Sequence, residues 1–137
     1  MDDRSSKLQS IRPTITTTKV YADTRNEEYF QNESLRPIIK LQNPLLLAAF
    51  KNYVRKHKNR FYELNVENRL LYIERAIQKD IKFRNSLKGM IIGQFTLEEY
   101  NEYIQNSSAL NKRMMNMVIA RIKDQVQLLE SDVLIYQ

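Results

Sequence analysis

The chain has 137 residues, a formal net charge of +6, no cysteine and only two glycines. A chain of this length forms one domain and can bury roughly two-thirds of its unfolded surface. Without cysteine it has no disulfide framework and no thiolate metal site. The longest unbroken apolar run covers residues 45–50, far short of the ~20 residues that cross a bilayer. The initial stretch, MDDRSSKLQS, lacks the apolar core of a secretory signal. We therefore expect a soluble, cytoplasmic protein that makes no membrane contact.

The first part of the chain, residues 1–34, shows no sustained helical period. Residues 15–21, ITTTKVY, form a β-branched run that suits extended chain better than helix. Because a lone strand has no partner for a sheet, we expect an extended, flexible N-terminal arm. It is either a disordered leader or a segment that becomes ordered on a partner. We expect a helical domain over residues 35–130 and a C-terminal tail over residues 131–137.

Two helix starts can be read from the first half of this domain. Asn43 followed by Pro44 predicts a helix that runs to about Lys58, because Asn caps free N–H groups and Pro fits the first turn. Residues 35–42 would form separate turns before it. Asn65 predicts the cap of a second helix, which ends near Lys79 or continues past Lys82.

The second half predicts three more helices. Residues 83–93 form a helix that ends at Gly93, with Gly89 as a possible point of close packing. Thr96 and Glu99 have the spacing of a capping box and open a short helix. Residue 107 or 108, both serines, caps the last helix, which runs to about residue 130.

Apolar residues at helical spacing mark one face of three of these helices, and this periodicity predicts an all-α bundle of four to five helices. The expected inward residues are Leu46, Phe50, Tyr53 and His57 in the first helix, Val66, Leu70, Ile73, Ile77 and Ile81 in the second, and Leu110, Met114, Met115, Val118, Ile119, Ile122, Val126 and Leu129 in the last.

The residues that most enzymes need are scarce in this sequence. His57 is the only histidine, and we expect it on the inner side of a helix end, near the last free carbonyls. One His without Cys cannot supply a typical zinc site. Glu98, Glu99 and Glu102 lie in the first turns of a helix, where negative charge complements the dipole. Because no glycine-rich phosphate loop or nucleophile elbow is present, we expect no catalysis, no metal, no cofactor and no small-molecule substrate.

Positive charge is concentrated in residues 35–88, which carry thirteen Lys and Arg against four Asp and Glu. At 100° per residue, cations form one outward row in each of two consecutive helices. Such a surface suits the phosphates of a nucleic acid, since each neutralised phosphate releases condensed counterions. The predicted RNA-binding residues are Lys51, Arg55, Lys56, Lys58, Arg60, Arg75, Lys79, Lys82, Arg84 and Lys88.

Aromatic residues beside these rows add a second kind of contact, because Phe61 or Tyr62 could stack on an unpaired base. No recognition helix or RNA-binding signature predicts readout of sequence, so we expect contacts to the backbone and to shape. A membrane surface is a weaker alternative, since no helix combines a spare apolar face with a basic one.

The block from LRPIIKLQNPLLLAAFKNYVRKHKNRFY through LLYIERAIQKDIKFRNSLKGMIIGQFTLEEYNEYIQNSSALNKRMMNMVIARI resembles a family of lineage-specific bacterial proteins. Members are often labelled glyoxalases, and one looks like an additional protein of the large ribosomal subunit. The glyoxalase label implies a mixed α/β protein with His and Glu metal ligands, which one histidine and a helical pattern do not support. The ribosomal resemblance implies ribosomal RNA and neighbouring ribosomal proteins as partners. The modest charge and the acidic arm would place the protein at the periphery of the particle.

The alternative hypothesis is a helical adaptor or regulator that binds another protein. Met114, Met115 and Met117 lie together in the last helix, and methionine-rich surfaces are adaptable binding sites. Methionine at helical spacing is more often part of the core, so we rank this hypothesis second.

Overall fold

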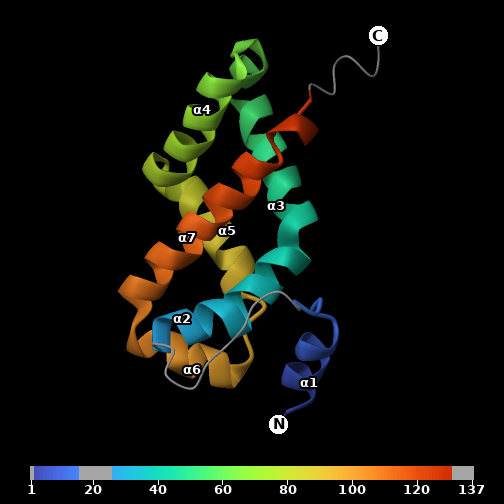
Figure 1. Ribbon diagram of the computed structural model, residues 1–137, viewed down its shortest axis with the longest axis vertical. Coiled ribbons are helices and arrows are strands. Elements are labelled where there is room, and N and C mark those ends of the chain that lie inside the picture. Colours follow the sequence, from blue (N-terminus) through green and yellow to red (C-terminus); the bar gives the residue numbers. More distant parts are fainter. Residues whose placement is uncertain (1, 16–25, 131–137) are drawn as a thin grey trace.

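The computed structural model describes residues 2–15 and 26–130 (Figure 1), and this part of the chain is helical without β-strands. The predicted all-α bundle is confirmed. The helices are α1 (Asp3–Ser10), α2 (Asn26–Phe30), α3 (Arg36–Lys56), α4 (Val66–Lys79), α5 (Ile81–Ile92), α6 (Leu97–Gln105) and α7 (Ser107–Asp124). A π-helical turn, η1 (Gln31–Leu35), precedes α3, and 3₁₀ turns occur at η2 (Arg60–Glu63) and η3 (Val126–Leu128). Most of the ITTTKVY run and the expected tail at 131–137 lie outside the described residues.

Four helices enclose the main core. Helix α7 crosses the bundle diagonally and contacts α3, α4 and α5, while α2 and α6 lie together at the end away from α4 (Figure 1). The apolar faces predicted from periodicity pack against one another in this core. The apolar stripe of α7 is wide because this helix packs against three others. The fully enclosed side chains include Leu35, Ile38, Leu46, Phe50, Phe61, Ile73, Ile77, Leu87, Ile91, Phe95, Met114 and Ile122.

Helix α3 begins earlier than the sequence predicted. Residues 26–56 are helical without a break, so Asn43 and Pro44 lie inside the helix and do not start one. Asn43 exchanges side-chain hydrogen bonds of 2.8 and 2.6 Å with Gln125 beyond α7. An internal proline removes one backbone hydrogen bond, but both Pro44 and Lys40, whose carbonyl loses its donor, are exposed to solvent. Tertiary packing of buried residues on both sides of the proline keeps the helix continuous.

Helices α4 and α5 meet at one residue, Asp80. Its carboxylate accepts a hydrogen bond of 3.2 Å from the Phe83 N–H and so caps α5. Asn65 caps α4 as predicted, accepting from the Asn68 N–H at 2.9 Å. The predicted stripe of α4 is correct in its middle but wrong at its ends, since Val66 and Ile81 are 60% and 70% exposed. The chain turns at both ends of α4, which takes these two side chains away from the core.

The C-terminal helices confirm one predicted cap and correct another. Thr96 and Glu99 form the capping box, with the Glu99 N–H donating to the Thr96 hydroxyl at 3.1 Å. Helix α7 starts at Ser107 after Asn106, whose side chain makes no capping hydrogen bond, and it ends at Asp124 with a 3₁₀ turn after it. Gly89 is not a packing point, because a Cβ there would meet nothing within 4 Å.

The N-terminal segment contains a helix that periodicity did not predict. Helix α1 is polar and short, and it is capped by Asp2, whose carboxylate accepts from the Ser5 N–H at 2.8 Å. Arg4 then donates to the carbonyl oxygens of Phe95 and Gly93, at 2.8 and 3.0 Å, after the end of α5. Helix α1 is therefore held by a cap and by side-chain hydrogen bonds. It lacks the apolar stripe from which a helix can be predicted. In the described residues, no helix is long and apolar enough to cross a membrane.

Candidate nucleic-acid interface

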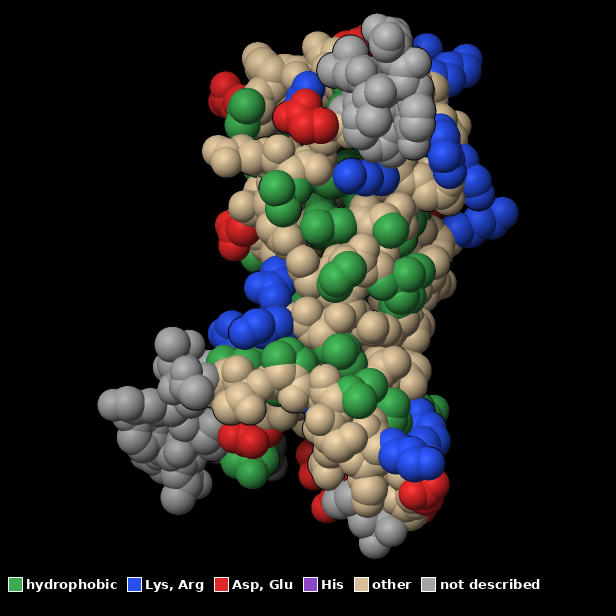
Figure 2. Space-filling model, turned by 90° about the vertical axis from the view of Figure 1, so that its right-hand side faces the viewer, with side chains coloured by type: hydrophobic (Ala, Val, Ile, Leu, Met, Phe, Trp, Pro, Cys, Tyr) green, Lys and Arg blue, Asp and Glu red, His purple; other side chains and the backbone are tan. Residues whose placement is uncertain are grey.

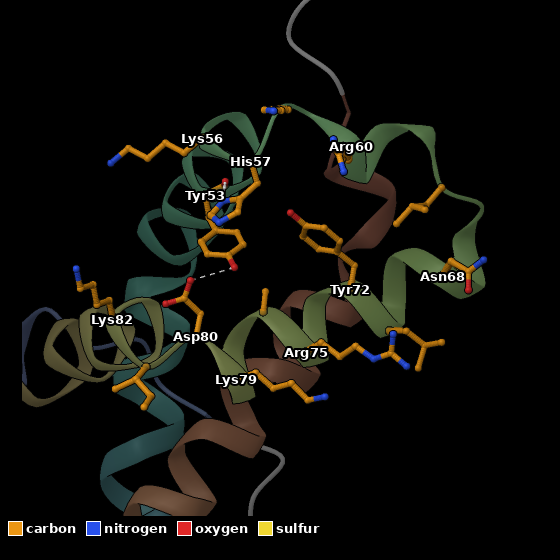
Figure 3. A pocket seen from close by; sticks show the side chains of 15 residues that line it. Tyr53, Lys56, His57, Arg60, Asn68, Tyr72, Arg75, Lys79, Asp80 and Lys82 are labelled. Carbon is orange, nitrogen blue, oxygen red and sulfur yellow. Dashed lines mark hydrogen bonds between the residues drawn. The ribbon is translucent and has the colours of Figure 1, made fainter.

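A groove of about 1210 Å³ opens at the end of the bundle where α3 stops and where α4 turns into α5. We call it the basic groove. In Figure 3 the rings of Tyr53, His57 and Tyr72 border this space, and cationic side chains such as Lys56 and Lys79 extend outward at its rim. It is lined by Tyr53, Lys56, His57, Lys58, Arg60, Leu64, Asn68, Leu71, Tyr72, Arg75, Ala76, Lys79, Asp80, Ile81 and Lys82.

A turn with unusual backbone geometry forms one wall of the groove. Lys58 and Asn59 have φ angles of 64° and 57°, and they are the non-glycine residues with positive φ in the described chain. Asn adopts this left-handed region readily, whereas Lys does so at a cost of roughly 1–2 kcal/mol. The Asn59 N–H donates to the Val54 carbonyl at 3.0 Å, which ties the turn to the end of α3. The reversal places Lys58 and Arg60 at the same groove as the end of α3.

Six of the ten predicted RNA-binding residues line this groove, and all six are exposed. They are Lys56, Lys58, Arg60, Arg75, Lys79 and Lys82. Asp80 is the only acid among the lining residues, and its carboxylate is already occupied by the cap of α5 and by a hydrogen bond of 3.2 Å from the Tyr53 hydroxyl. Clefts lined by one sign of charge concentrate the field. The groove is therefore a positive surface that one carboxylate compensates only in part.

The other four predicted cations lie outside the groove. Arg55 is exposed and donates to the Asn52 side chain at 2.8 Å, whereas Arg84, Lys88 and Lys51 are half-buried. Figure 2 shows Lys and Arg gathered at one edge of the upper part of the molecule, with hydrophobic side chains in the middle of that face. Positive charge thus extends beyond the groove, but the groove is where exposed cations from separate helices line one cavity.

Aromatic rings form the back of the groove. The ring of Tyr53 stacks on His57, with centroids 4.0 Å apart, and on Phe83, with centroids 4.3 Å apart. Burial, followed by the charge and hydrogen bond of Asp80, raises the pKa of Tyr53 to about 12. The hydroxyl therefore stays protonated and keeps donating to Asp80 at neutral pH. Tyr72 faces this group from α4 (Figure 3), and burial raises the pKa of its hydroxyl as well.

His57 differs from the prediction in one respect. It lies near the last carbonyls of α3, as expected, with Nδ1 at 2.7 Å from the Tyr53 carbonyl oxygen. However, its side chain is exposed at the groove and does not face the core. The ring stacks against the outside of Tyr53 because α3 ends at Lys56, so His57 has already left the helical geometry.

The predicted stacking residues are not those the structure offers. Phe61 is fully buried against Phe50, so it cannot contact a base. Tyr62 is half-buried and does not line the groove. Tyr72 was missed, although residues 68, 72, 75 and 79 follow the spacing of one helix face and all line the groove. This spacing places the Tyr72 ring on the same helix face as Arg75 and Lys79.

The methionines of the last helix and the clustered carboxylates of α6 lie outside the groove. Met114 and Met115 are buried in the core, and Met117 is half-buried. No cluster of three or more potential metal ligands occurs within residues 2–15 and 26–130. Glu102 has a raised pKa because of burial and the nearby charges of Glu98 and Glu99.

Glu99 has a structural role that the capping box alone does not reveal. Its carboxylate accepts two hydrogen bonds of 2.7 Å from the Arg12 guanidinium, and it also accepts from the Thr96 N–H at 2.8 Å. Burial would raise the pKa of Glu99, but the hydrogen bonds from Arg12, Ser34 and Thr96 outweigh it and lower the pKa. This pair attaches the segment after α1 to α6, at the opposite end of the bundle from the groove (Figure 1).

The fold and groove define a small all-α protein with a basic, aromatic-backed cleft. The chain matches no family model, no curated protein and no solved structure in the three comparisons made.

Proposed function

We propose that this protein binds RNA through the basic groove, without catalysis, as an accessory component of the large ribosomal subunit in the cytoplasm. The observation that supports RNA binding is that six exposed cations line one groove in which the single acid is already hydrogen-bonded. Polyanion binding would relieve the mutual repulsion of these cations and release counterions from the phosphates. The aromatic back of the groove distinguishes it from a merely solvated basic face.

The ribosomal part of the proposal rests on the sequence resemblance given above. Ribosomal RNA would be the ligand of the groove, and neighbouring ribosomal proteins would contact other faces. In this arrangement the acidic C-terminal part of the chain faces solvent or a neighbouring protein, because six acids and four cations occur in residues 89–137.

Sedimentation tests the proposal directly. The protein should co-sediment with large subunits at low salt, and a triple charge reversal in the groove, Lys58→Glu, Arg75→Glu and Lys82→Glu, should leave it at the top of the gradient. The matched control is Lys7→Glu, Lys40→Glu and Lys112→Glu, which changes the charge equally at exposed positions outside the groove and should still co-sediment. Wild-type protein that stays at the top at low salt would refute the ribosomal assignment. A protein complex that survives nuclease and high salt would instead support the adaptor hypothesis.

A further inference from the structure

Three aromatic rings form a continuous stack that ends in the groove. His57 and Phe83 both lie nearly parallel to Tyr53, at interplanar angles of 23° and 27°. Two rings on one face of Tyr53 at centroid distances of 4.0 and 4.3 Å would overlap each other, so they lie on opposite faces. The order is therefore Phe83, Tyr53, His57, and Phe83 is also in contact with the buried Phe50. His57 is the outermost ring of the stack.

The outer ring is held in place before any ligand arrives. Because a carbonyl oxygen can only accept, the 2.7 Å contact with the Tyr53 carbonyl requires a proton on His57 Nδ1. This hydrogen bond and the stack on Tyr53 together hold the ring plane; both residues are drawn in Figure 3. A preordered ring loses little conformational entropy when it binds.

The positions of the cations suit a strand whose base reaches this ring. Lys56 and Lys58 flank His57 in the chain, and Lys82 and Arg60 lie around the same groove from α5 and η2. Phosphates on either side of a stacked nucleotide would have separate cations to contact. Proteins that bind single strands combine a positive groove with rings on which bases stack.

We propose that the groove binds single-stranded RNA and that an unpaired base stacks on the outward face of His57, extending the Phe83–Tyr53–His57 stack by one ring. The inference deepens the proposed function and rests on it. A base within a duplex has both faces covered by its neighbours, so only an unpaired base can take this place.

The experiment compares three RNA probes with equal backbone length: an oligoadenylate, the same oligomer with abasic sites in place of the bases, and a duplex. Stacking predicts that wild-type protein binds the oligoadenylate roughly 5- to 150-fold more tightly than the abasic oligomer, which is the range for one stacked base. His57→Ala should remove this difference, while His57→Phe should retain it because the ring remains. Tyr100→Ala, an exposed ring on α6 away from the groove, is the matched control and should change nothing.

The outcomes separate this inference from the function on which it rests. Equal affinity of wild-type protein for the oligoadenylate and the abasic oligomer would overturn the stacking, even if charge reversal in the groove still abolished binding. Tighter binding of the duplex would overturn the single-stranded ligand. Failure of the wild-type protein to bind any of the three probes at low salt would refute the proposed function itself. Circular dichroism of each variant confirms that its fold is retained.

Discussion

The salt dependence of RNA binding gives a quantitative test of the basic groove. Each cation that contacts a phosphate of a single strand contributes about −0.7 to the slope of log affinity against log salt concentration, so six cations predict a slope of about −4. A fourfold rise in salt should then weaken binding by about 300-fold. The perturbation is the neutral triple variant Lys56→Gln, Arg75→Gln and Lys82→Gln, which removes one exposed cation from each of α3, α4 and α5.

This variant should bind with a slope of about −2, and the same rise in salt should weaken it by only about 20-fold. Fluorescence anisotropy with a labelled single-stranded RNA, measured over a salt series, gives both slopes. The matched control is Lys7→Gln, Lys40→Gln and Lys112→Gln, which changes the net charge by the same amount outside the groove and should keep the wild-type slope. Equal slopes in the two triple variants would refute the reasoning, because the groove would then have no advantage over diffuse charge.

Three further predictions concern the fold and the residues that support the site. Arg12→Ala should lower the free energy of unfolding by about 3–5 kcal/mol, because Glu99 is left buried without its partner. The lowered pKa of Glu99 stabilises the fold above the unfolded pKa, and this stability is lost as pH falls through the folded pKa. Urea titrations should therefore show less acid sensitivity in the variant, and unchanged sensitivity would contradict the pairing of Arg12 with Glu99. Ultraviolet titration should show one tyrosine with a pKa of about 12 that is absent in Tyr53→Phe. This raised pKa supplies stability that is present below the unfolded value of 10.0 and is lost as pH rises towards 12. Ionisation of Tyr53 near 10 would mean that its hydroxyl does not donate to Asp80. Pro44→Ala should raise the free energy of unfolding by about 1–3 kcal/mol, because alanine restores the N–H that can donate to the Lys40 carbonyl. An unchanged or lower free energy of unfolding would show that the proline does not destabilise α3.

The sequence was sufficient for the fold class because apolar residues at helical spacing have a direct physical consequence. Ile73 and Ile77 in α4 are buried as that spacing predicted, and so are Leu110, Met114, Val118 and Ile122 in α7. The capping signals at Asn65 and Thr96 are local, and they were also correct. The Pro44 signal was misleading because the packing of residues far away in sequence keeps α3 helical through it.

The groove could be predicted only in part. Outward cations were found from the period of each helix, but their convergence depends on how α3, α4 and α5 end against one another. The turn at Lys58 and Asn59 decides that Lys58 and Arg60 join the groove. Asn59 suits its positive φ angle, but nothing in the sequence indicates a positive φ at Lys58. The role of Arg12 was missed for a similar reason, since its partner Glu99 lies on α6 and is brought to it only by the tertiary fold.

The central claim is that RNA contacts this protein at the basic groove. Ultraviolet crosslinking of the full chain to RNA in the cells that produce it, followed by mass spectrometry of the nucleotide-bearing peptides, tests it most directly. We expect crosslinks within residues 53–60 and 72–82, with ribosomal RNA as the attached species. Crosslinks confined to α1, α6 or α7, or protein recovered without RNA, would contradict it.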